Sequence, residues 1–249
     1  MTHLRPVLLT LLGVFIMVVE AAGQSASAAT EILDNTHLLG NAPNIILTAT
    51  MDIRSSRGDK SRTIDIYISQ DEETSKILAQ VSSPPFLRNL KFLTHQFANG
   101  SDDRWVKTSR GVRRLAEGNY GEALFDSDFT VEDLSRIDQS RFDLEVTDPG
   151  DTSGLRAVKA TPTYKNPDYD YKIFLIETET GMLTGVDFYS GDTIVRKYTL
   201  VDRQVVDGEL YPLLCKMEDF EKNTSTILEI EAVSIEDSIP ARMFNRGSL

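Results

Sequence analysis

The feature that most constrains the fold of this chain is an alternation of apolar and polar residues that recurs through most of its length. Within residues 45–54 nearly every second side chain is apolar, and Ile64, Ile66 and Ile68 repeat the pattern. In a β-strand, this period places alternate side chains on opposite faces of the sheet. Together with residues 77–81, these segments predict an antiparallel meander with one apolar and one solvated face.

The same alternation continues toward the C-terminus, interrupted by turn dipeptides. Ser153-Gly154, Thr180-Gly181, Ser190-Gly191 and Asp207-Gly208 stand between the later segments. Many strands without alternating helices predict a mainly β protein with one large antiparallel sheet, curved or closed. The further predicted strands are residues 91–96, 104–108, 142–147, 156–161, 171–178, 183–189, 193–202, 209–220 and 226–235.

Two short helices are expected beside the sheet. One spans residues 30–39 and ends before Gly40. The other begins at Thr130, where the sequence Thr-Val-Glu-Asp is typical of a capping box. Both are too short to be stable alone, so each must lie on the sheet. A curved sheet covered by such helices leaves room for an apolar cavity.

The first residues have the pattern of a secretory signal. Arg5 precedes an apolar run over residues 7–19, and small residues follow from Ala21. The run is shorter than the roughly 20 residues that span a bilayer comfortably. We therefore predict a signal peptide over residues 1–23, with residue 29 as the alternative cleavage point, and a single soluble domain over residues 24–249. An uncleaved membrane anchor is the alternative.

Charge and cysteine content exclude several classes of protein. The chain has 38 acidic against 26 basic residues and a net charge of −12, which repels phosphate backbones and argues against a nucleic-acid partner. Cys215 is the single cysteine, so no disulfide can form within the chain.

No motif of a known catalytic machinery is present. The sequence lacks G-x-S-x-G, H-E-x-x-H, a P-loop and G-x-G-x-x-G. A hydrolase triad would have to use His37 or His95, the histidines outside the signal. Asp126 begins a stretch like a calcium loop, but Val131 and Ile137 occupy its glycine and glutamate positions. We predict a protein that is not an enzyme, with no cofactor and no metal.

A basic cluster surrounds the single tryptophan, Trp105. Two interpretations are open: the charged exterior of a hairpin, or a contact surface for an anionic lipid headgroup or an acidic partner, for which arginine is well suited. The cluster consists of Arg104, Lys107, Arg110, Arg113 and Arg114.

Three segments carry a resemblance to a known family. Residues 102–106 (Asp-Asp-Arg-Trp-Val), 111–115 (Gly-Val-Arg-Arg-Leu) and 125–134 (Phe-Asp-Ser-Asp-Phe-Thr-Val-Glu-Asp-Leu) resemble the signature of the outer-membrane lipoprotein-sorting, LolA-like family. The resemblance extends over about residues 45–249. Asp126 departs from the pattern, because the family usually has glycine there.

This resemblance implies a half-open β-barrel with short helices as a lid over an apolar cavity, in a protein exported to the periplasm. It also implies that the cavity receives the acyl chains of lipids or lipoproteins, and that an inner-membrane transporter or lipoprotein-release complex is a partner. The residues that match the lid motif are Ser127, Asp128, Phe129, Asp133 and Leu134.

The residues and the resemblance together predict a periplasmic carrier that moves acyl chains toward the outer membrane. Apolar burial is sufficient to bind such a ligand. The alternatives are a lipid-binding accessory subunit of an RND-type inner-membrane transporter, or an acyl-ester hydrolase. The predicted cavity residues, which could equally fill a closed core, are Leu47, Met51, Ile53, Ile64, Ile66, Ile68, Trp105, Phe174 and Phe188.

Overall fold

The computed structural model describes residues 25–34, 36, 38–98, 102–116, 120–150, 152–164 and 168–249. The predicted signal peptide and His37 lie outside this part of the chain. Within it, no helix has the length and apolar character needed to cross a membrane.

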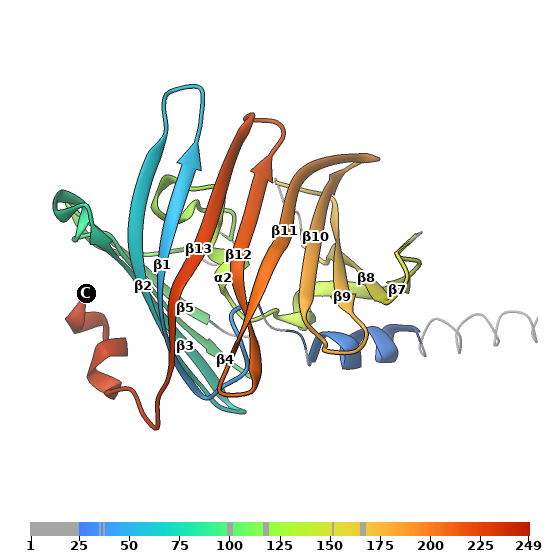
Figure 1. Ribbon diagram of the computed structural model, residues 1–249, viewed down its shortest axis with the longest axis horizontal. Coiled ribbons are helices and arrows are strands. Elements are labelled where there is room, and N and C mark those ends of the chain that lie inside the picture. Colours follow the sequence, from blue (N-terminus) through green and yellow to red (C-terminus); the bar gives the residue numbers. More distant parts are fainter. Residues whose placement is uncertain are drawn as a thin grey trace, which may run out of the picture.

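The described residues form one antiparallel sheet of 13 strands that is strongly curved (Figure 1). The first half of the sheet is a meander of β1 (Asn44–Arg54), β2 (Lys60–Gln70), β3 (Thr74–Ser83), β4 (Lys91–Phe97), β5 (Asp102–Thr108) and β6 (Gly111–Arg114). The second half is a meander of β7 (Phe142–Thr147), β8 (Leu155–Pro162), β9 (Tyr171–Glu177), β10 (Leu183–Ser190), β11 (Thr193–Val206), β12 (Glu209–Asp219) and β13 (Thr224–Ile235).

The two meanders join where β1 pairs with β13, so that β6 and β7 are the two edges. This order confirms the predicted fold, which is mainly β. The sheet is curved and half open, because its two edge strands do not pair with each other. The predicted strands are all present, and the bounds of β7 match the prediction to the residue. The hairpin between β11 and β12 turns at Asp207 and Gly208, whose φ angles of 52° and 86° fit a tight turn for which Asp-Gly is favoured.

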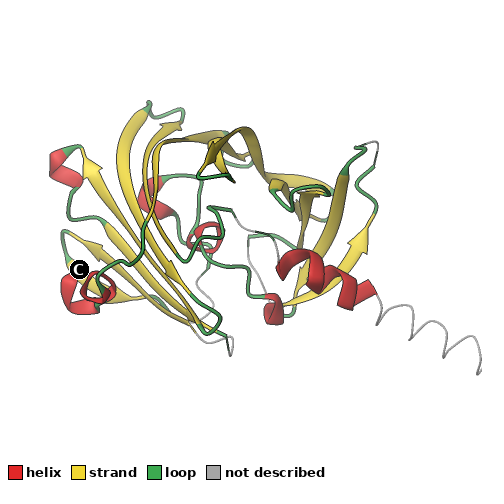
Figure 2. Cartoon of the chain, turned by 60° about the horizontal axis from the view of Figure 1, so that its bottom comes forward, coloured by secondary structure: helices red, strands yellow, loops and turns green. Residues whose placement is uncertain are grey.

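The main core lies on the concave face of the sheet. The alternate apolar side chains of β1, β2 and β3 point into it, and so do those of β9 to β13. The segment between β6 and β7 crosses this face, and Figure 2 shows its loops and short helices inside the curve of the sheet. We call residues 120–137 the lid; they contain a 3₁₀ turn, Leu124–Asp126, and the helix α2, Val131–Leu134.

A second, smaller core lies on the outer face of the sheet. Leu78, Leu93 and Trp105 are neighbours in register across β3, β4 and β5, and the C-terminal segment packs on them through Ile239 and Phe244. This segment forms the short helical turns Ala241–Phe244 and Arg246–Ser248 beside the first meander (Figure 1).

The predicted N-terminal helix is placed differently from our expectation. Residues 25–34 are helical, whereas Thr36, Leu38 and Leu39 are not. The hydroxyl of Thr36 donates to the carbonyl oxygen of Ile32 at 2.8 Å, and its backbone N–H donates to the oxygen of Leu33 at 3.0 Å. These bonds satisfy the last carbonyls and end the helix early.

Candidate ligand cavity beneath the lid

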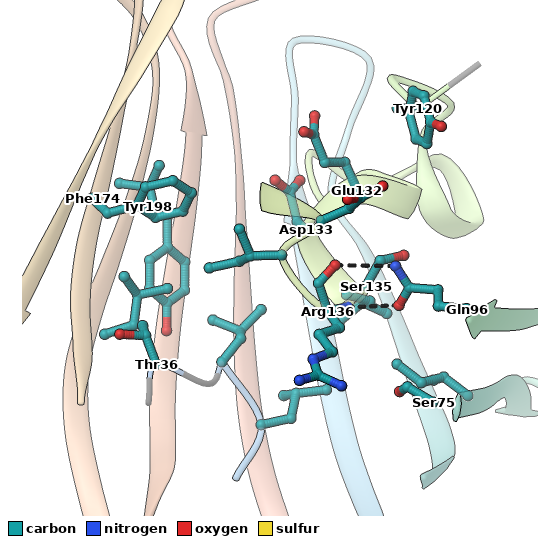
Figure 3. Close-up of a pocket in the computed structure, with 18 of the residues that line it drawn as sticks. Thr36, Ser75, Gln96, Tyr120, Glu132, Asp133, Ser135, Arg136, Phe174 and Tyr198 are labelled. Carbon is teal, nitrogen blue, oxygen red and sulfur yellow. Dashed lines mark hydrogen bonds between the residues drawn. The ribbon is translucent and has the colours of Figure 1, made fainter. Parts of the chain in front are cut away.

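A cavity of about 90 Å³ lies between the lid and the concave face. Its apolar wall comes from β2, β3 and β9 to β12, and lid residues such as Leu134 and Ile137 close it. Figure 3 shows the lid residues Asp133 and Ser135 beside this wall. Ligand pockets for small molecules usually measure roughly 300–1,000 Å³. The cavity in this arrangement is therefore the space that remains while the lid fills most of the concave face.

The lid is held to the sheet by side chains rather than by a backbone ladder. Among the described residues, the backbone-to-backbone hydrogen bonds of residues 120–137 stay within the lid itself, for example from Val131 to Glu122 and from Leu124 to Phe129. At its far end, Gln96 exchanges two hydrogen bonds with the backbone of Arg136, at 2.8 and 3.0 Å (Figure 3). Such a segment can separate from the sheet without breaking strand pairing.

The predicted capping box forms at the start of α2. The carboxylate of Asp133 accepts hydrogen bonds from the backbone N–H of Thr130 at 2.7 Å and from its hydroxyl at 2.8 Å. This arrangement confirms that the helix begins after Thr130. It also directs the polar end of the helix toward β9 and β11, while Val131 and Leu134 are buried against the apolar wall.

Three acidic residues of the lid each pair with a buried cation on the concave face. The cations come from β2, β9 and β11, and their side chains are between 4% and 9% exposed. The pairs are Asp126 with Arg62 at 2.9 Å, Glu132 with Lys172 at 2.9 Å, and Asp133 with Arg196 at 2.5 Å.

Glu132 has the most complete set of donors. Lys172 Nζ lies 2.9 Å from its carboxylate, the hydroxyl of Tyr169 donates to both oxygens at 2.9 and 3.0 Å, and Arg141 lies 3.9 Å away. Burial by itself would raise the pKa of Glu132, but the attraction of Lys172 and the hydrogen bonds outweigh burial and lower it. Glu132 is therefore ionised at neutral pH.

The lid-motif residues form a second attachment, to β13. The Asp128 carboxylate accepts from the hydroxyls of Thr224 and Thr226, and the backbone N–H of Asp128 donates to the Thr226 hydroxyl oxygen at 3.0 Å. The ring of Phe129 contacts Tyr198 edge to face, with ring centroids 6.5 Å apart. Ser127 shapes the turn, because its hydroxyl oxygen accepts from the N–H of Phe129 at 3.2 Å.

The structure gathers eight of the nine predicted cavity residues on the concave face. Ile68, Phe174 and Phe188 line the cavity itself. The other five belong to the same buried cluster: Leu47, Met51, Ile53, Ile64 and Ile66.

Trp105 is the exception among the predicted cavity residues. It lies on the outer face of β5, in the cluster covered by the C-terminal segment. Its neighbours in sequence, Arg104 and Val106, point to the opposite face, where Val106 packs against the main core. Because both Trp105 and Val106 are apolar, the alternation alone does not distinguish which of them faces inward.

The basic cluster does not form one exposed surface. Arg104 is only 2% exposed and stacks on the Tyr120 ring, with its guanidinium carbon 3.8 Å from the ring centroid. Arg113 and Arg114 project from opposite faces of β6 and pair with Glu122 and Asp103. Lys107 lies beside Lys91, and Arg110 is in the exposed turn. Arg104 is therefore not part of an exposed surface and lies against Tyr120 of the lid. Contact of the other four residues with a headgroup or partner stays a prediction.

The buried cations that hold the lid were not predicted from the sequence. Arg62 is in phase with Ile64 and Ile66, and Lys172 is in phase with Phe174. A charged residue at a position that alternation assigns to the apolar face is rare without a partner. That irregularity in the pattern is the signal that could have identified these residues.

The structure gives a reason for the aspartate at position 126, where the family usually has glycine. Its φ angle is 59°, in the left-handed region where glycine is the favoured residue. Here the side chain is used, because its carboxylate pairs with the buried Arg62. The departure thus adds one ion pair between the lid and β2.

The candidate catalytic groups lie in settings that suit packing. His95 is on the outer face, with Nε2 2.7 Å from the carbonyl oxygen of Phe244, and burial lowers its pKa although that hydrogen bond opposes the change. Cys215 is buried next to the Tyr198 hydroxyl at 3.3 Å, and burial raises its pKa to about 11. A thiol of this kind is a weak nucleophile.

The chain matches one family model and several solved structures. A family model described as "-like: Uncharacterized protein" matches residues 73–249. No curated protein sequence matches significantly.

Solved structures with a similar fold include three bacterial proteins. An outer membrane lipoprotein-sorting protein domain from Vibrio parahaemolyticus has a TM-score of 0.79 and 19% identity, covering 91% of this chain and 98% of that one. A DUF1329 family protein from Desulfovibrio piger has a TM-score of 0.77 and 17% identity, covering 93% and 98%. A LolA superfamily protein from Nitrosomonas europaea has a TM-score of 0.67 and 14% identity, covering 89% and 99%. The chain therefore belongs to the family that the matching model describes, and its fold is that of the outer-membrane lipoprotein-sorting, LolA-like proteins.

Proposed function

We propose that this protein is a periplasmic carrier that binds the acyl chains of lipids or lipoproteins on its concave face and moves them toward the outer membrane. The observation that carries the proposal is the way the lid is attached, through side chains. Within the described part of the chain, the lid backbone makes no hydrogen bond to the backbone of the sheet, yet the lid covers a continuous apolar surface. Opening of the lid would expose that surface to a ligand.

The energetics of acyl-chain burial fit this proposal. Removing a methylene group from water contributes about 0.8 kcal/mol, so a twelve-carbon chain gains roughly 10 kcal/mol before ordering costs. The lid side chains Phe129, Val131 and Leu134 occupy the concave face in the closed form. An acyl chain would replace one set of apolar contacts by another, which keeps the exchange reversible, as a carrier requires.

The surroundings of the cavity favour binding over catalysis. His95, the described histidine outside the signal, lies on the opposite face of the sheet, and the Cys215 thiol is protonated at neutral pH. We therefore propose a binding protein with no catalytic residue. We further propose that the signal directs it to the periplasm, where an inner-membrane transporter or lipoprotein-release complex loads it.

The proposal is tested by uptake of a neutral fluorescent probe with a dodecyl chain by the mature protein. Val186→Trp places a large ring into the cavity wall and is expected to weaken probe binding at least tenfold. The matched control Val201→Trp changes an exposed valine on β11 and is expected to bind as the unaltered protein does. Circular dichroism checks that both variants keep the fold.

Two results would contradict the proposal. One is no uptake of the probe by the unaltered protein, and the other is full binding by a folded Val186→Trp variant. Transfer of the probe between two vesicle populations then separates a carrier from an accessory subunit. A carrier accelerates transfer, whereas an accessory subunit retains the probe.

A further inference from the structure

The concave face is cationic as well as apolar, and the lid supplies the ion-pair partners of its buried cations Arg62, Lys172 and Arg196, while Asp219 of β12 is a further acid near Arg196. Asp126, Glu132 and Asp133 pair with these cations respectively. All three acids lie within a stretch of eight residues, and among the described residues the backbone of this stretch makes no hydrogen bond to the backbone of the sheet. In the closed form, carboxylates of the lid therefore lie on the surface where we propose that the ligand binds.

Lys172 is the cation most closely surrounded by apolar groups. Its Nζ lies 4.6 Å from the ring centroid of Phe142, 5.0 Å from that of Phe174 and 5.8 Å from that of Phe188. Arg196 is placed similarly, with its guanidinium carbon 4.4 Å from the Phe188 centroid. When the lid leaves, Lys172 and Arg196 lose the carboxylates that pair with them inside an apolar wall, and Asp219 of β12 stays near Arg196. Removing the partner of a buried cation is strongly unfavourable.

The buried guanidinium groups also retain unused donors. Among the described residues, Nε and Nη1 of Arg62 and Nε of Arg196 have no hydrogen-bond acceptor. Around Glu132, the Tyr169 hydroxyl and Arg141 complete a set of donors directed at a single carboxylate. A ligand with several acceptor oxygens could use more of these donors than the lid carboxylates do.

We propose that the ligand of this cavity is an acyl chain with an anionic head, a carboxylate or a phosphate, and that this head takes the place of the Glu132 and Asp133 carboxylates on Lys172 and Arg196. This inference rests on the proposed acyl-chain function and specifies the ligand class. The anion relieves the charge that the departing lid leaves unpaired, so ligand entry and lid release occur as one exchange.

The test compares four dodecyl ligands, each below its micelle-forming concentration, in displacing the neutral dodecyl probe. Dodecanoate and dodecyl phosphate are expected to displace it at concentrations at least tenfold lower than dodecanol, and dodecyltrimethylammonium less effectively than dodecanol. The first two distinguish a carboxylate head from a phosphate head. Inorganic phosphate alone is expected to displace nothing, because it has no chain.

Substitutions test whether Lys172 and Arg196 cause the preference for anionic ligands. In the double variant Lys172→Met with Arg196→Met, dodecanoate and dodecyl phosphate are expected to lose their tenfold advantage over dodecanol. Lys197→Met, on the opposite face of β11, is the matched control and should keep it. Glu132→Gln keeps both cations and removes a competing carboxylate, so it should bind dodecanoate several-fold more tightly. If the double variant does not fold, this variant alone tests the preference for an anionic head.

The outcomes separate this inference from the proposed function. If dodecanol and dodecanoate displace the probe equally, or if Glu132→Gln leaves dodecanoate binding unchanged, the anionic preference is overturned while acyl-chain binding stands. If the probe itself does not bind, both are overturned.

Discussion

The carboxylate of Asp133 lies 2.5 Å from the guanidinium of Arg196, although 63 positions separate the two residues. The same carboxylate caps α2 through Thr130. One side chain therefore sets both the local start of the lid helix and its attachment to β11. Loss of this carboxylate is expected to affect the lid more than loss of any solvent-exposed acid.

We expect Asp133→Asn to lower the free energy of unfolding by about 3–5 kcal/mol, because it removes the carboxylate that pairs with the buried Arg196 and leaves that cation to the more weakly acting Glu132 and Asp219. Urea unfolding measures the change. Asp143→Asn, an exposed acid on β7, should stay within about 0.5 kcal/mol of the unaltered protein. A loss below 1 kcal/mol for Asp133→Asn would mean that the pair contributes little to the closed form.

The attachment of the lid to β13 gives a second prediction. Thr226→Val keeps the side-chain shape but removes the hydroxyl that donates to Asp128 and accepts from its N–H. Because hydrogen bonds to charged groups contribute about 1.5–3 kcal/mol, we expect a destabilisation of that size. Thr199→Val on the outer face of β11 is the control, and hydrogen exchange should show faster exchange of the lid amides only in Thr226→Val.

The docking of the C-terminal segment should depend on pH through His95. Burial lowers the pKa of His95 below its ordinary value of 6.5, although the hydrogen bond to Phe244 opposes this. Between the two pKa values of His95, the folded protein binds fewer protons than the unfolded chain. The stabilisation that neutral His95 gives the folded protein is therefore present above about pH 6.5 and is lost as the pH falls toward the lowered pKa.

Trp105 provides the readout for this titration, since its ring centroid is 5.3 Å from that of His95 and it is the single tryptophan. We expect its fluorescence to change as the pH falls below 6.5, and the change to disappear in His95→Gln. An unchanged titration in His95→Gln would assign the effect to another group.

Cys215 should report whether the lid is closed. It is 1% exposed and its pKa is raised to about 11, so at pH 8 roughly one thiol in a thousand is ionised. We expect slow reaction with a thiol reagent in the native protein and faster reaction in Asp133→Asn. Thr199→Cys combined with Cys215→Ala is the control for an accessible thiol, and equal rates at Cys215 in the native and Asp133→Asn proteins would show that the lid does not cover it.

Local pattern was sufficient to predict the strands, the turn at Asp207 and Gly208, and the start of α2 after Thr130. Each of these depends on residues within a few positions of one another. Period-two alternation sets which side chains of a strand share a face, and the capping box requires two residues three positions apart. The bounds of the N-terminal helix were predicted wrongly for a related reason. The hydrogen bonds of Thr36 that end this helix leave no mark on the periodicity of apolar residues.

Only the tertiary structure decided which face each strand turns inward and which charges meet. Trp105 and Val106 are both apolar, so the position of β5 within the curved sheet, and the C-terminal segment that covers its outer face, assigned Trp105 to the outside. Asp126, Glu132 and Asp133 meet Arg62, Lys172 and Arg196 because the connection between the two meanders crosses the concave face. Pairing between residues tens of positions apart depends on how the whole sheet curves. The local sequence does not determine that curvature; its only sign of these pairs is a cation at a position that alternation assigns to the apolar face.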